Sequence, residues 1–308
     1  MSTGPPIPPS PASSARDLVI RPATVADLPR LWVIRAASDA PDPLDPPPAG
    51  TPPPILGHLL RTATLLLAER DGQIVGFGGR ADRGDVAFLT DLFVDPALQS
   101  AAVGKTLLHE LFQGVGPRRC TLASSDARAV ALYTRAGMTP RWPNLDLWAE
   151  SSRLHLPPAR GVSLRTADPF DEAFLKWDAA VGGRRRPQDF AFFRDEQAAS
   201  FFWLDAATGP VGYAVVRRDS VTGVRDDTLT IGPVGGRTAA AARAGTLAAV
   251  AWAQERAPRL EITVPGPHPA LRPLLEAGFR IDYIGTYCAS ALVRLNPARY
   301  IPSGGDLY

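Results

Sequence analysis

The alternation of apolar and polar positions predicts a chain in which short strands and amphipathic helices follow each other in a fixed order. In the first half, apolar runs predict strands at residues 18–21, 64–69, 73–80, 86–94, 120–123 and 139–148. Apolar spacings of three and four predict helices at residues 24–32, 55–61, 107–112 and 126–136. Asp71-Gly72 joins two of the strands and favours a tight hairpin turn. The pattern predicts an α/β fold.

The second half repeats this order of elements. The apolar runs predict strands at 162–165, 200–204, 211–217, 228–231 and 260–264, and a last strand that ends near residue 287. A turn is expected at 232–236, and helices are expected near 170–177, 238–254 and 268–277. Corresponding residues are separated by similar intervals: Arg165 less Arg21 is 144, and Gly278 less Gly137 is 141. Such a period indicates two copies of one domain. We expect domains at 18–150 and 162–295, a linker at 151–161, a disordered tail at 1–17, and a tail at 296–308.

One segment of the first copy combines a strand, a turn of small residues and a helix. The strand at 86–94 must end at Asp95-Pro96, because proline has no N–H and a fixed φ. Residues 99–104 keep side chains short before Leu107 begins the apolar face of the helix. The first N–H groups of a helix have no intrahelical partner and the helix dipole is positive there, so phosphate can bind largely to main chain. This turn is therefore a candidate anion site.

Composition narrows the class of protein. The chain has 308 residues, 45% of them hydrophobic, and a formal charge of +2, which gives no global electrostatic reason to expect nucleic acid or an acidic membrane as partner. Cys120 and Cys288 lie in apolar runs where a buried, reduced thiol is expected, which fits a cytoplasmic protein. No apolar stretch is long enough to span a bilayer, and the first residues lack the apolar region of a signal peptide. The four histidines have no metal-binding spacing, so no metal is expected.

The order of these motifs resembles the GNAT superfamily of N-acetyltransferases. The first motif reads Val94-Asp95-Pro96 and then Gln99 to Gly104, and the second reads Asp126, Ala129, Tyr133 and Gly137 within one helix. The resemblance covers residues 18–148 well and 162–292 weakly. The chain is similar to tandem GNAT proteins of this size, with a degenerate second copy. The resemblance implies that each copy is a mixed, mostly antiparallel sheet with helices on both faces, and a bacterial source is expected.

The resemblance implies an acetyl-CoA site and a catalytic pair. The pyrophosphate is expected on the main chain of residues 99–105, with the pantetheine arm along the strand edge; this cofactor set is Phe93, Val94, Gln99, Ser100, Ala101, Ala102, Val103, Gly104, Lys105 and Asp126. Tyr133 is expected to protonate the departing thiolate, and Asp91 to act as the base or to position a water. The acceptor is expected to be a primary amine of a small molecule, or less readily of a peptide or protein. The acceptor pocket is expected to come from residues 32–61.

The sequence departs from the family pattern at several positions. Ala102 replaces the first motif glycine, so its Cβ is a potential obstacle to the pyrophosphate. In the second copy, Leu274 stands at the position of Tyr133, and residues 232–238 lack the glycine motif. We therefore expect catalysis in the first copy alone.

Several alternatives remain open at this stage. Gly104-Lys105-Thr106 also resembles the end of a Walker A loop, although Gln99 stands where that motif needs glycine. Tyr133 could be a core residue and Asp91 an ordinary polar position of a half-buried strand. Residues 184–186, all arginine, are expected in a solvated loop rather than at an anion site, and the aromatic tail at 300–308 is expected to be disordered rather than docked in an active site. The protein is expected to be a monomer or homodimer, and a catalytically silent acyl-CoA sensor or scaffold is the second functional hypothesis.

Overall fold

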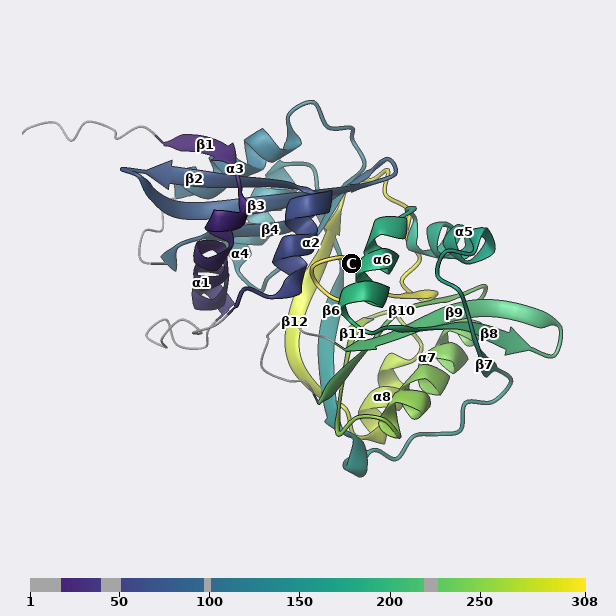
Figure 1. The fold of residues 1–308 in the computed structure, drawn as a ribbon. Coiled ribbons are helices and arrows are strands. Elements are labelled where there is room, and N and C mark those ends of the chain that lie inside the picture. Colours follow the sequence, from purple (N-terminus) through teal and green to yellow (C-terminus); the bar gives the residue numbers. More distant parts are fainter. Residues whose placement is uncertain (1–17, 40–50, 97–100, 219–226) are drawn as a thin grey trace, which may run out of the picture.

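The computed structural model describes residues 18–39, 51–96, 101–218 and 227–308 (Figure 1). Its strands form one continuous 13-stranded sheet with the order β1-β2-β3-β4-β5-β12-β6-β11-β10-β9-β8-β7, and β13 pairs with β10 off this path. The pairs β4 with β5 and β10 with β11 are parallel, and the others are antiparallel. The predicted α/β class with a mixed, mostly antiparallel sheet is confirmed.

The elements of the first half follow the predicted order. They are β1 (Val19–Pro22), η1 (Val25–Asp27), α1 (Leu28–Asp39), α2 (Pro54–Thr62), β2 (Thr64–Arg70), β3 (Gln73–Arg83), β4 (Val86–Val94), α3 (Ala101–Phe112), β5 (Arg119–Ala123), α4 (Ala127–Arg135) and β6 (Thr139–Glu150). The first helical turn is fixed by a capping box, in which the Asp27 carboxylate accepts from the Thr24 N–H at 2.8 Å. Asp71 and Gly72 both have positive φ, as a tight hairpin turn requires.

The second half also follows the prediction over most of its length. Its elements are η3 (Ser151–Arg153), β7 (Ser163–Thr166), α5 (Glu172–Gly182), α6 (Pro187–Glu196), β8 (Ser200–Ala206), β9 (Gly209–Arg218), β10 (Thr228–Gly236), α7 (Ala239–Gln254), β11 (Arg259–Pro265), α8 (Leu271–Ala277), β12 (Arg280–Ala289) and β13 (Tyr300–Ile301). Helix α6 was not predicted, although Pro187 at its start is a typical first helical residue. The turn predicted at 232–236 is wrong, because β10 continues through it by a register shift between Ile231 and Val234.

The last long strand of each half lies in the sheet of the other half. β12 lies between β5 and β6, with Tyr287 opposite Leu122 on one side and Trp142 on the other. β6 lies in turn between β12 and β11, with Leu147 opposite Ile262. The division into domains at 18–150 and 162–295 therefore stays a proposal about the sequence repeat, because the sheet itself runs through both segments.

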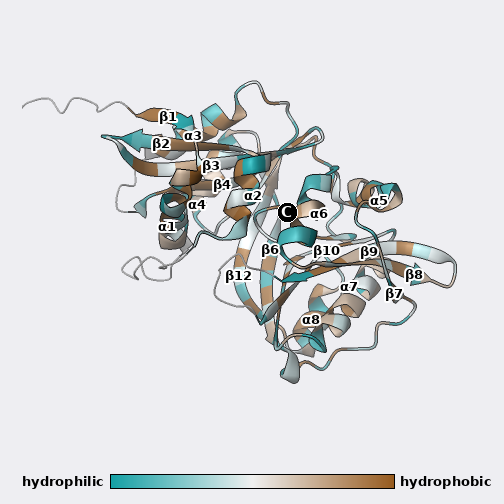
Figure 2. Cartoon of the chain, in the orientation of Figure 1, coloured by the Kyte–Doolittle hydropathy of each residue, from teal (hydrophilic) through white to brown (hydrophobic). Residues whose placement is uncertain are grey.

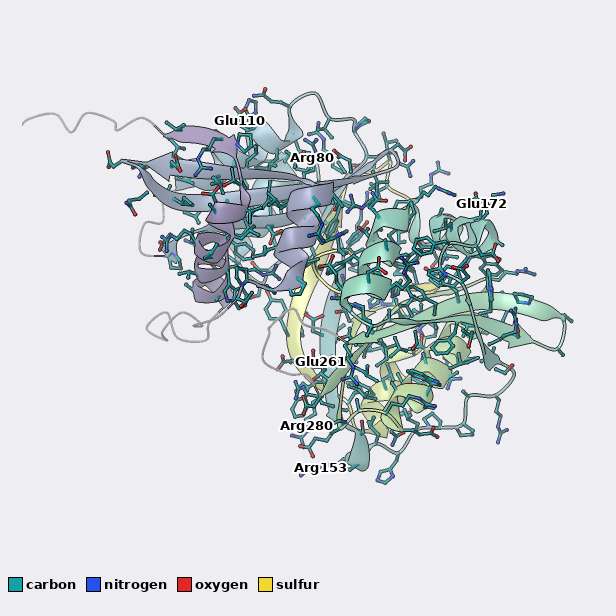
Figure 3. All side chains as sticks on the ribbon, viewed as in Figure 1. Arg80, Glu110, Arg153, Glu172, Glu261 and Arg280 are labelled. Atoms are coloured by element: carbon teal, nitrogen blue, oxygen red, sulfur yellow. The ribbon has the colours of Figure 1, made fainter. Side chains whose placement is uncertain are left out.

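Helices cover both faces of the sheet, and one hydrophobic core joins the two halves. α3 packs on β2 to β4 through residues such as Leu107 and Leu111. On the other face, α1 and α2 of the first half share a core with α5 and α6 of the second half, which includes Leu31, Leu59, Phe174 and Phe190. Figure 2 shows brown, apolar residues along the strands and teal residues on exposed loops. Figure 3 shows side chains filling the space between α2, α6 and the sheet, with Glu172 and Arg153 at the surface.

The C-terminal segment is ordered and buried, so the expectation of a disordered tail is wrong. Tyr308 is fully buried and stacks on Tyr287 with ring centroids 4.5 Å apart. Its hydroxyl accepts from Trp142 Nε1 at 3.2 Å. The sequence gives no local indication of this, because the contacts come from elements far away along the chain.

The arginine run 184–186 holds this segment, and the expectation of a solvated loop is wrong for two of its three residues. Arg184 donates to the Leu307 carbonyl at 2.9 Å, and Arg186 donates to the Tyr300 hydroxyl at 2.8 Å and to the Leu307 carbonyl at 3.0 Å. Arg186 also forms a two-pronged ion pair with Asp178, at 2.8 and 3.0 Å, in which both side chains are buried. Arg185 is exposed and pairs with Glu172.

We expect Asp178→Asn to destabilise the protein by about 3–5 kcal/mol, because it leaves the buried Arg186 guanidinium without its counter-charge. Urea unfolding at equilibrium measures this. Glu172→Gln, which removes the exposed partner of Arg185, is the control and should change the midpoint little. Equal midpoints for the two variants would contradict the structural role of the buried pair.

Candidate active site

Strands β4 and β5 diverge and leave one edge of β4 open. They pair in parallel only from Ala87 opposite Arg119 to Leu89 opposite Thr121. The register against β3 shifts at Gly79 and Arg80, so Thr90 is an extra residue that bends β4. Beyond this bulge, residues 90–94 pair with β3 on one side and with no strand of the described residues on the other. An extended ligand can add to such an edge as another strand.

Glycines of β3 make room for the bulge. A Cβ on Gly79 would lie 2.3 Å from Thr90 Oγ1 and 3.1 Å from Asp91 Oδ2. A Cβ on Gly78 would lie 2.7 Å from the Leu111 side chain, so helix α3 also needs a glycine beneath it. The run Gly76-Phe77-Gly78-Gly79 was the sequence feature that could have located this bulge.

Helix α3 begins beside the open edge, as predicted. Of the predicted cofactor set, Gln99 and Ser100 lie outside the described residues, and Ala101 is the first residue of the helix. Val103 and Gly104 are buried against β3 and β4, whereas Ala102 and Lys105 are exposed. The start of α3 therefore lies near the end of β4, where Phe93 and Val94 lie, and an anion there would face the positive end of the helix dipole.

The helical conformation of Gly104-Lys105-Thr106 argues against the Walker A alternative. All three residues lie inside α3, and the Thr106 hydroxyl donates to the Ala102 carbonyl of the preceding turn at 2.9 Å. In a phosphate-binding loop these residues follow a glycine-rich loop, and the hydroxyl is free for a metal ion.

Tyr133 lies on α4 in a buried, apolar environment. Its ring packs in a core with Leu108, Ala123, Met138 and Cys288. Burial raises the pKa of its hydroxyl well above the usual value, and the nearby Cys288, Asp91 and Asp126 act in the same direction. The hydroxyl is thus protonated at neutral pH and can serve as a proton donor.

Asp91 reaches the opposite side of the sheet, where it meets Arg35 of α1. Its side chain is buried, and Oδ1 lies 3.4 Å from Arg35 Nη1. Arg35 Nη2 in turn donates to Asp306 Oδ1 of the C-terminal segment at 2.8 Å. The Arg35 guanidinium also lies 6.0 Å from the centre of the Phe93 ring. Strand β4, helix α1 and the C-terminal segment therefore meet at Asp91.

Arg35 and Asp306 were missed in the sequence. Arg35 follows Leu31 by four residues and so lies on the apolar side of α1, which is an available signal for a buried charge. Asp306 has no such signal, because its place depends on the return of the chain from the second half.

Asp126 is the N-cap residue of helix α4. Its Oδ1 accepts from the Arg128 N–H at 2.8 Å, which is the geometry of a helix N-cap. The Arg128 guanidinium, hydrogen-bonded to the same carboxylate, lowers the pKa of Asp126. Its contact with a cofactor stays a prediction.

The second half repeats the divergence of strands, but its own chain occupies the open edge. β10 and β11 pair in parallel from Thr228 opposite Arg259 to Ile231 opposite Ile262. Beyond that point β13 pairs with β10, with Gly235 opposite Tyr300, and the Gly236 N–H donates to the Arg299 carbonyl at 3.0 Å. Gly236 of β10 pairs with Gly212 of β9, and Val94 of β4 pairs with Gly76 of β3 at the equivalent position of the first half. β13 therefore lies along the edge of β10 that corresponds to the open edge of β4 beside Val94.

The catalytic positions are also missing from the second half. Leu274 on α8, the counterpart of Tyr133, is buried in the core of that half. Pro233 stands at the register shift of β10, where β4 carries Thr90 and Asp91. Neither residue can transfer a proton.

Neither a metal centre nor a membrane-spanning helix is evident. Across the described ranges, no three His, Cys, Asp or Glu side chains gather as metal ligands would. No helix in these same ranges is long and apolar enough to cross a bilayer. Cys120 and Cys288 are buried free thiols, as predicted.

We expect Gly79→Ala to cost about 1–3 kcal/mol of stability, because the new Cβ must displace Thr90 and the bulge. Gly116→Ala is the matched control, since a Cβ there meets nothing within 4 Å. Thermal and urea unfolding of both variants test this. Equal stability of the two variants would show that Thr90 and the bulge can move aside without a loss of folding free energy.

Comparison with known proteins agrees with this geometry. The sequence model described as "Acetyltransferase (GNAT) family" matches residues 35–138, which contain the bulge, α3 and α4. The search of curated proteins gave no match.

Three solved structures illustrate the similarity of fold. A protein of Pyrococcus horikoshii, provisionally assigned as an acetyltransferase, is 17% identical, with 94% of this chain and 96% of that chain covered and a TM-score of 0.69. A GCN5-related N-acetyltransferase of Sphaerobacter thermophilus is 16% identical, with 91% and 97% covered and a TM-score of 0.58. A tandem GNAT protein from the clavulanic acid biosynthesis pathway is 16% identical, with 89% and 98% covered and a TM-score of 0.59.

At these identities the solved structures establish the fold, and the family model establishes the relationship of the first half. Residues 35–138 therefore match the GNAT acetyltransferase family model, and the chain as a whole has the fold seen in a tandem GNAT protein.

Proposed function

We propose that the protein is an acetyl-CoA-dependent N-acetyltransferase that acts on a primary amine of a small molecule, with its active site in the first half. The match of residues 35–138 to the GNAT family model supports acyl transfer from acyl-CoA in general. The observation that carries the more specific proposal is the open edge of β4, which lies between the start of α3, Tyr133 and the buried Asp91.

The residues around this edge fit acetyl-CoA. The pyrophosphate would bind the N–H groups at the start of α3, and the extended pantetheine arm would lie along Phe93 and Val94. The exposed side chain of Ala102 points away from the core, which favours binding in spite of the missing glycine. The pairing of β13 with β10 supports the same view, since it is an extended chain at the equivalent edge of the second half.

The reaction requires one bond to form and one to break. Acetyl-CoA supplies a thioester that is activated for attack by an amine. The amine nitrogen bonds to the acetyl carbon, the carbon–sulfur bond breaks, and the thiolate takes a proton. Tyr133 is the proposed donor of that proton, since burial keeps its hydroxyl protonated.

Asp91 is the proposed partner of the amine. The guanidinium of Arg35 lies 3.4 Å from this carboxylate and orients it, and we assign Asp91 to positioning the amine or a water that removes its proton. Asp306, on the other side of Arg35, adds a second carboxylate near the same place. Two carboxylates attract a cationic amine more than a neutral acceptor.

Direct transfer needs no acylated cysteine. Burial raises the pKa of the Cys288 thiol to about 11 and raises that of Cys120 as well, so both remain poorly nucleophilic thiols at neutral pH. The C-terminal segment also covers the sheet near Phe88, through the ring of Tyr308 at 6.2 Å. This cover favours a small amine over a folded protein as acceptor.

A catalytically silent acyl-CoA sensor or scaffold is the second candidate. The structure of the second half favours it in one respect, because that half keeps the fold without the catalytic residues. Retention of a buried Tyr133 in the first half favours the enzyme.

Calorimetric titration with acetyl-CoA is expected to show one site per chain, because β13 occupies the equivalent edge of the second half. Coenzyme A without the acetyl group serves as a second titrant for the same site. Absence of binding would exclude both the enzyme and the sensor, and two sites would contradict the proposed role of β13.

Tyr133→Phe is expected to lower turnover by about 10²- to 10⁴-fold while leaving the Kd for acetyl-CoA unchanged, since it removes the proton donor but keeps the packing. Thiol release over a panel of small amines provides the assay. Tyr283→Phe is the control, because the Tyr283 hydroxyl is bonded to the Ser125 N–H outside the catalytic set. Unchanged turnover of Tyr133→Phe would remove Tyr133 as the acid. Binding of acetyl-CoA by the unaltered protein without thiol release with any amine would favour the sensor.

A further inference from the structure

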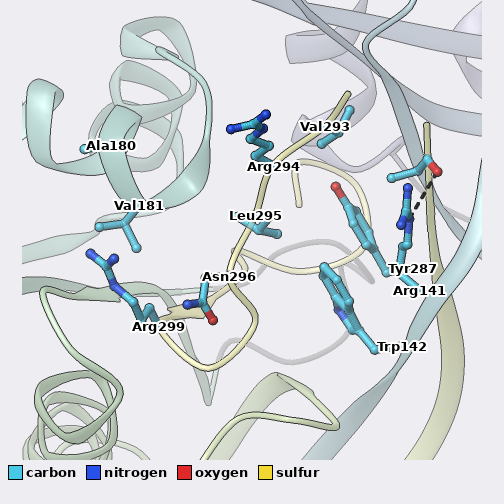
Figure 4. Close-up of a pocket in the computed structure, with 11 residues that line it drawn as sticks. Arg141, Trp142, Ala180, Val181, Tyr287, Val293, Arg294, Leu295, Asn296 and Arg299 are labelled. Atoms are coloured by element: carbon cyan, nitrogen blue, oxygen red, sulfur yellow. Dashed lines mark hydrogen bonds between the residues drawn. The ribbon is translucent and has the colours of Figure 1, made fainter. Parts of the chain in front are cut away.

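A pocket of about 400 Å³, separate from the candidate active site, lies at the junction of the two halves (Figure 4). Four segments line it: the start of β6, the end of β12, the end of α5, and residues 293–299. Its volume is within the range of small-molecule sites. None of its lining residues belongs to the predicted cofactor or catalytic set, and β5 lies between β12 and the open edge of β4.

Three arginines line this pocket and no acidic residue does. Arg141, Arg294 and Arg299 come from β6 and from the segment after β12. In the part of the chain that the structure describes, none of the three forms an ion pair with a carboxylate, whereas Arg21, Arg83 and Arg186 each do. Arg141 Nε donates to the Ala289 carbonyl at 3.4 Å, and Arg299 Nε donates to the Gly236 carbonyl at 3.0 Å. Main-chain carbonyls orient these two guanidinium groups but do not neutralise them.

The rest of the lining is aromatic and apolar. Trp142 and Tyr287 stack with ring centroids 4.7 Å apart, and Figure 4 shows both rings across the pocket from Arg294 and Arg299. Val181, Val293 and Leu295 supply further apolar surface. An occupant would therefore bring an apolar, preferably planar, body together with a negative group.

We propose that this pocket binds a small organic anion, a carboxylate or phosphate carried on an apolar or aromatic body. Guanidinium groups match the planar carboxylate and the phosphate oxygens with paired N–H donors. Three cations that have no carboxylate partner among the described residues repel each other around one cavity, and a bound anion relieves that repulsion. Trp142, the edge of the Tyr287 ring and the neighbouring aliphatic side chains give the body of the ligand an apolar contact.

The position of the pocket connects its occupant to the C-terminal segment. Tyr287 stacks on Trp142 on the pocket side and on Tyr308, at 4.5 Å, within the protein. Residues 293–299 line the pocket and lead directly into β13. An anion bound here would hold residues 293–299 in place and so stabilise the segment that follows.

Titration calorimetry with phenyl phosphate, benzoate and benzyl alcohol tests this site. Phenyl phosphate or benzoate should bind, and benzyl alcohol, which has the ring without the charge, should not. The stronger of the two anions identifies the preferred head group.

Arg294→Gln and Arg141→Gln should each weaken binding about tenfold, the loss expected for one charge-assisted contact. Both side chains are exposed and outside the core, so the variants should fold.

Arg272→Gln is the matched control, because Arg272 is an exposed arginine on α8 that pairs with Glu276 away from the pocket. It should bind the anion as the unaltered protein does. Hydrogen exchange gives an independent readout, with slower exchange of residues 293–299 expected when the anion is bound. The proposal is overturned if neither anion binds at millimolar concentration, if all three arginine variants bind alike, or if saturating acetyl-CoA displaces the anion.

Discussion

The divergence of two parallel strands is the constraint on which this structure depends. Once β4 parts from β5 after Leu89, and β10 from β11 after Ile231, the main-chain groups on one edge of each strand lose their ladder partners. Such groups must find other partners, because an unpaired buried N–H or C=O is costly. The second half satisfies its edge with β13 of the same chain. In the first half no described strand pairs with the corresponding edge of β4, where we propose that the ligand binds, and this difference separates the two copies more clearly than any single substitution.

The C-terminal segment links the two halves at the proposed active site. It leaves β13 in the second half and is held by Arg184 and Arg186. It then reaches the first half, where Asp306 meets Arg35 beside Asp91. The strand at the edge of β10 and the contact with Arg35 beside Asp91, the proposed catalytic carboxylate, thus come from one short stretch of chain. The second half thus contributes Asp306 to the proposed site, although it lacks counterparts of Tyr133 and Asp91.

The sequence predicted the elements well because periodicity, caps and turns are local. The hairpin at Asp71-Gly72, the capping box at Thr24 and the end of α4 at Gly137 all follow from neighbouring residues. The errors came from long-range contacts. Residues 184–186 were judged by their charge, but Asp178 and the returning tail bury two of them. The strand through Gly232-Pro233 was judged by its composition, but a register shift between β9 and β10 accommodates it.

The same distinction applies to the candidate site. Tyr133 was predicted from motif spacing and Asp91 from the alternation of side chains along its strand, whereas Arg35 and Asp306 are brought together only by the three-dimensional fold. The exchange of β6 and β12 explains why a copy without catalytic residues remains part of the protein. Without the second half, β5 would lose β12 beside it, and Ala123 would lose its pairing with Thr286. Without the first half, β11 would lose β6 in the same way. Each half therefore needs a strand of the other to complete its sheet, whatever the second half binds.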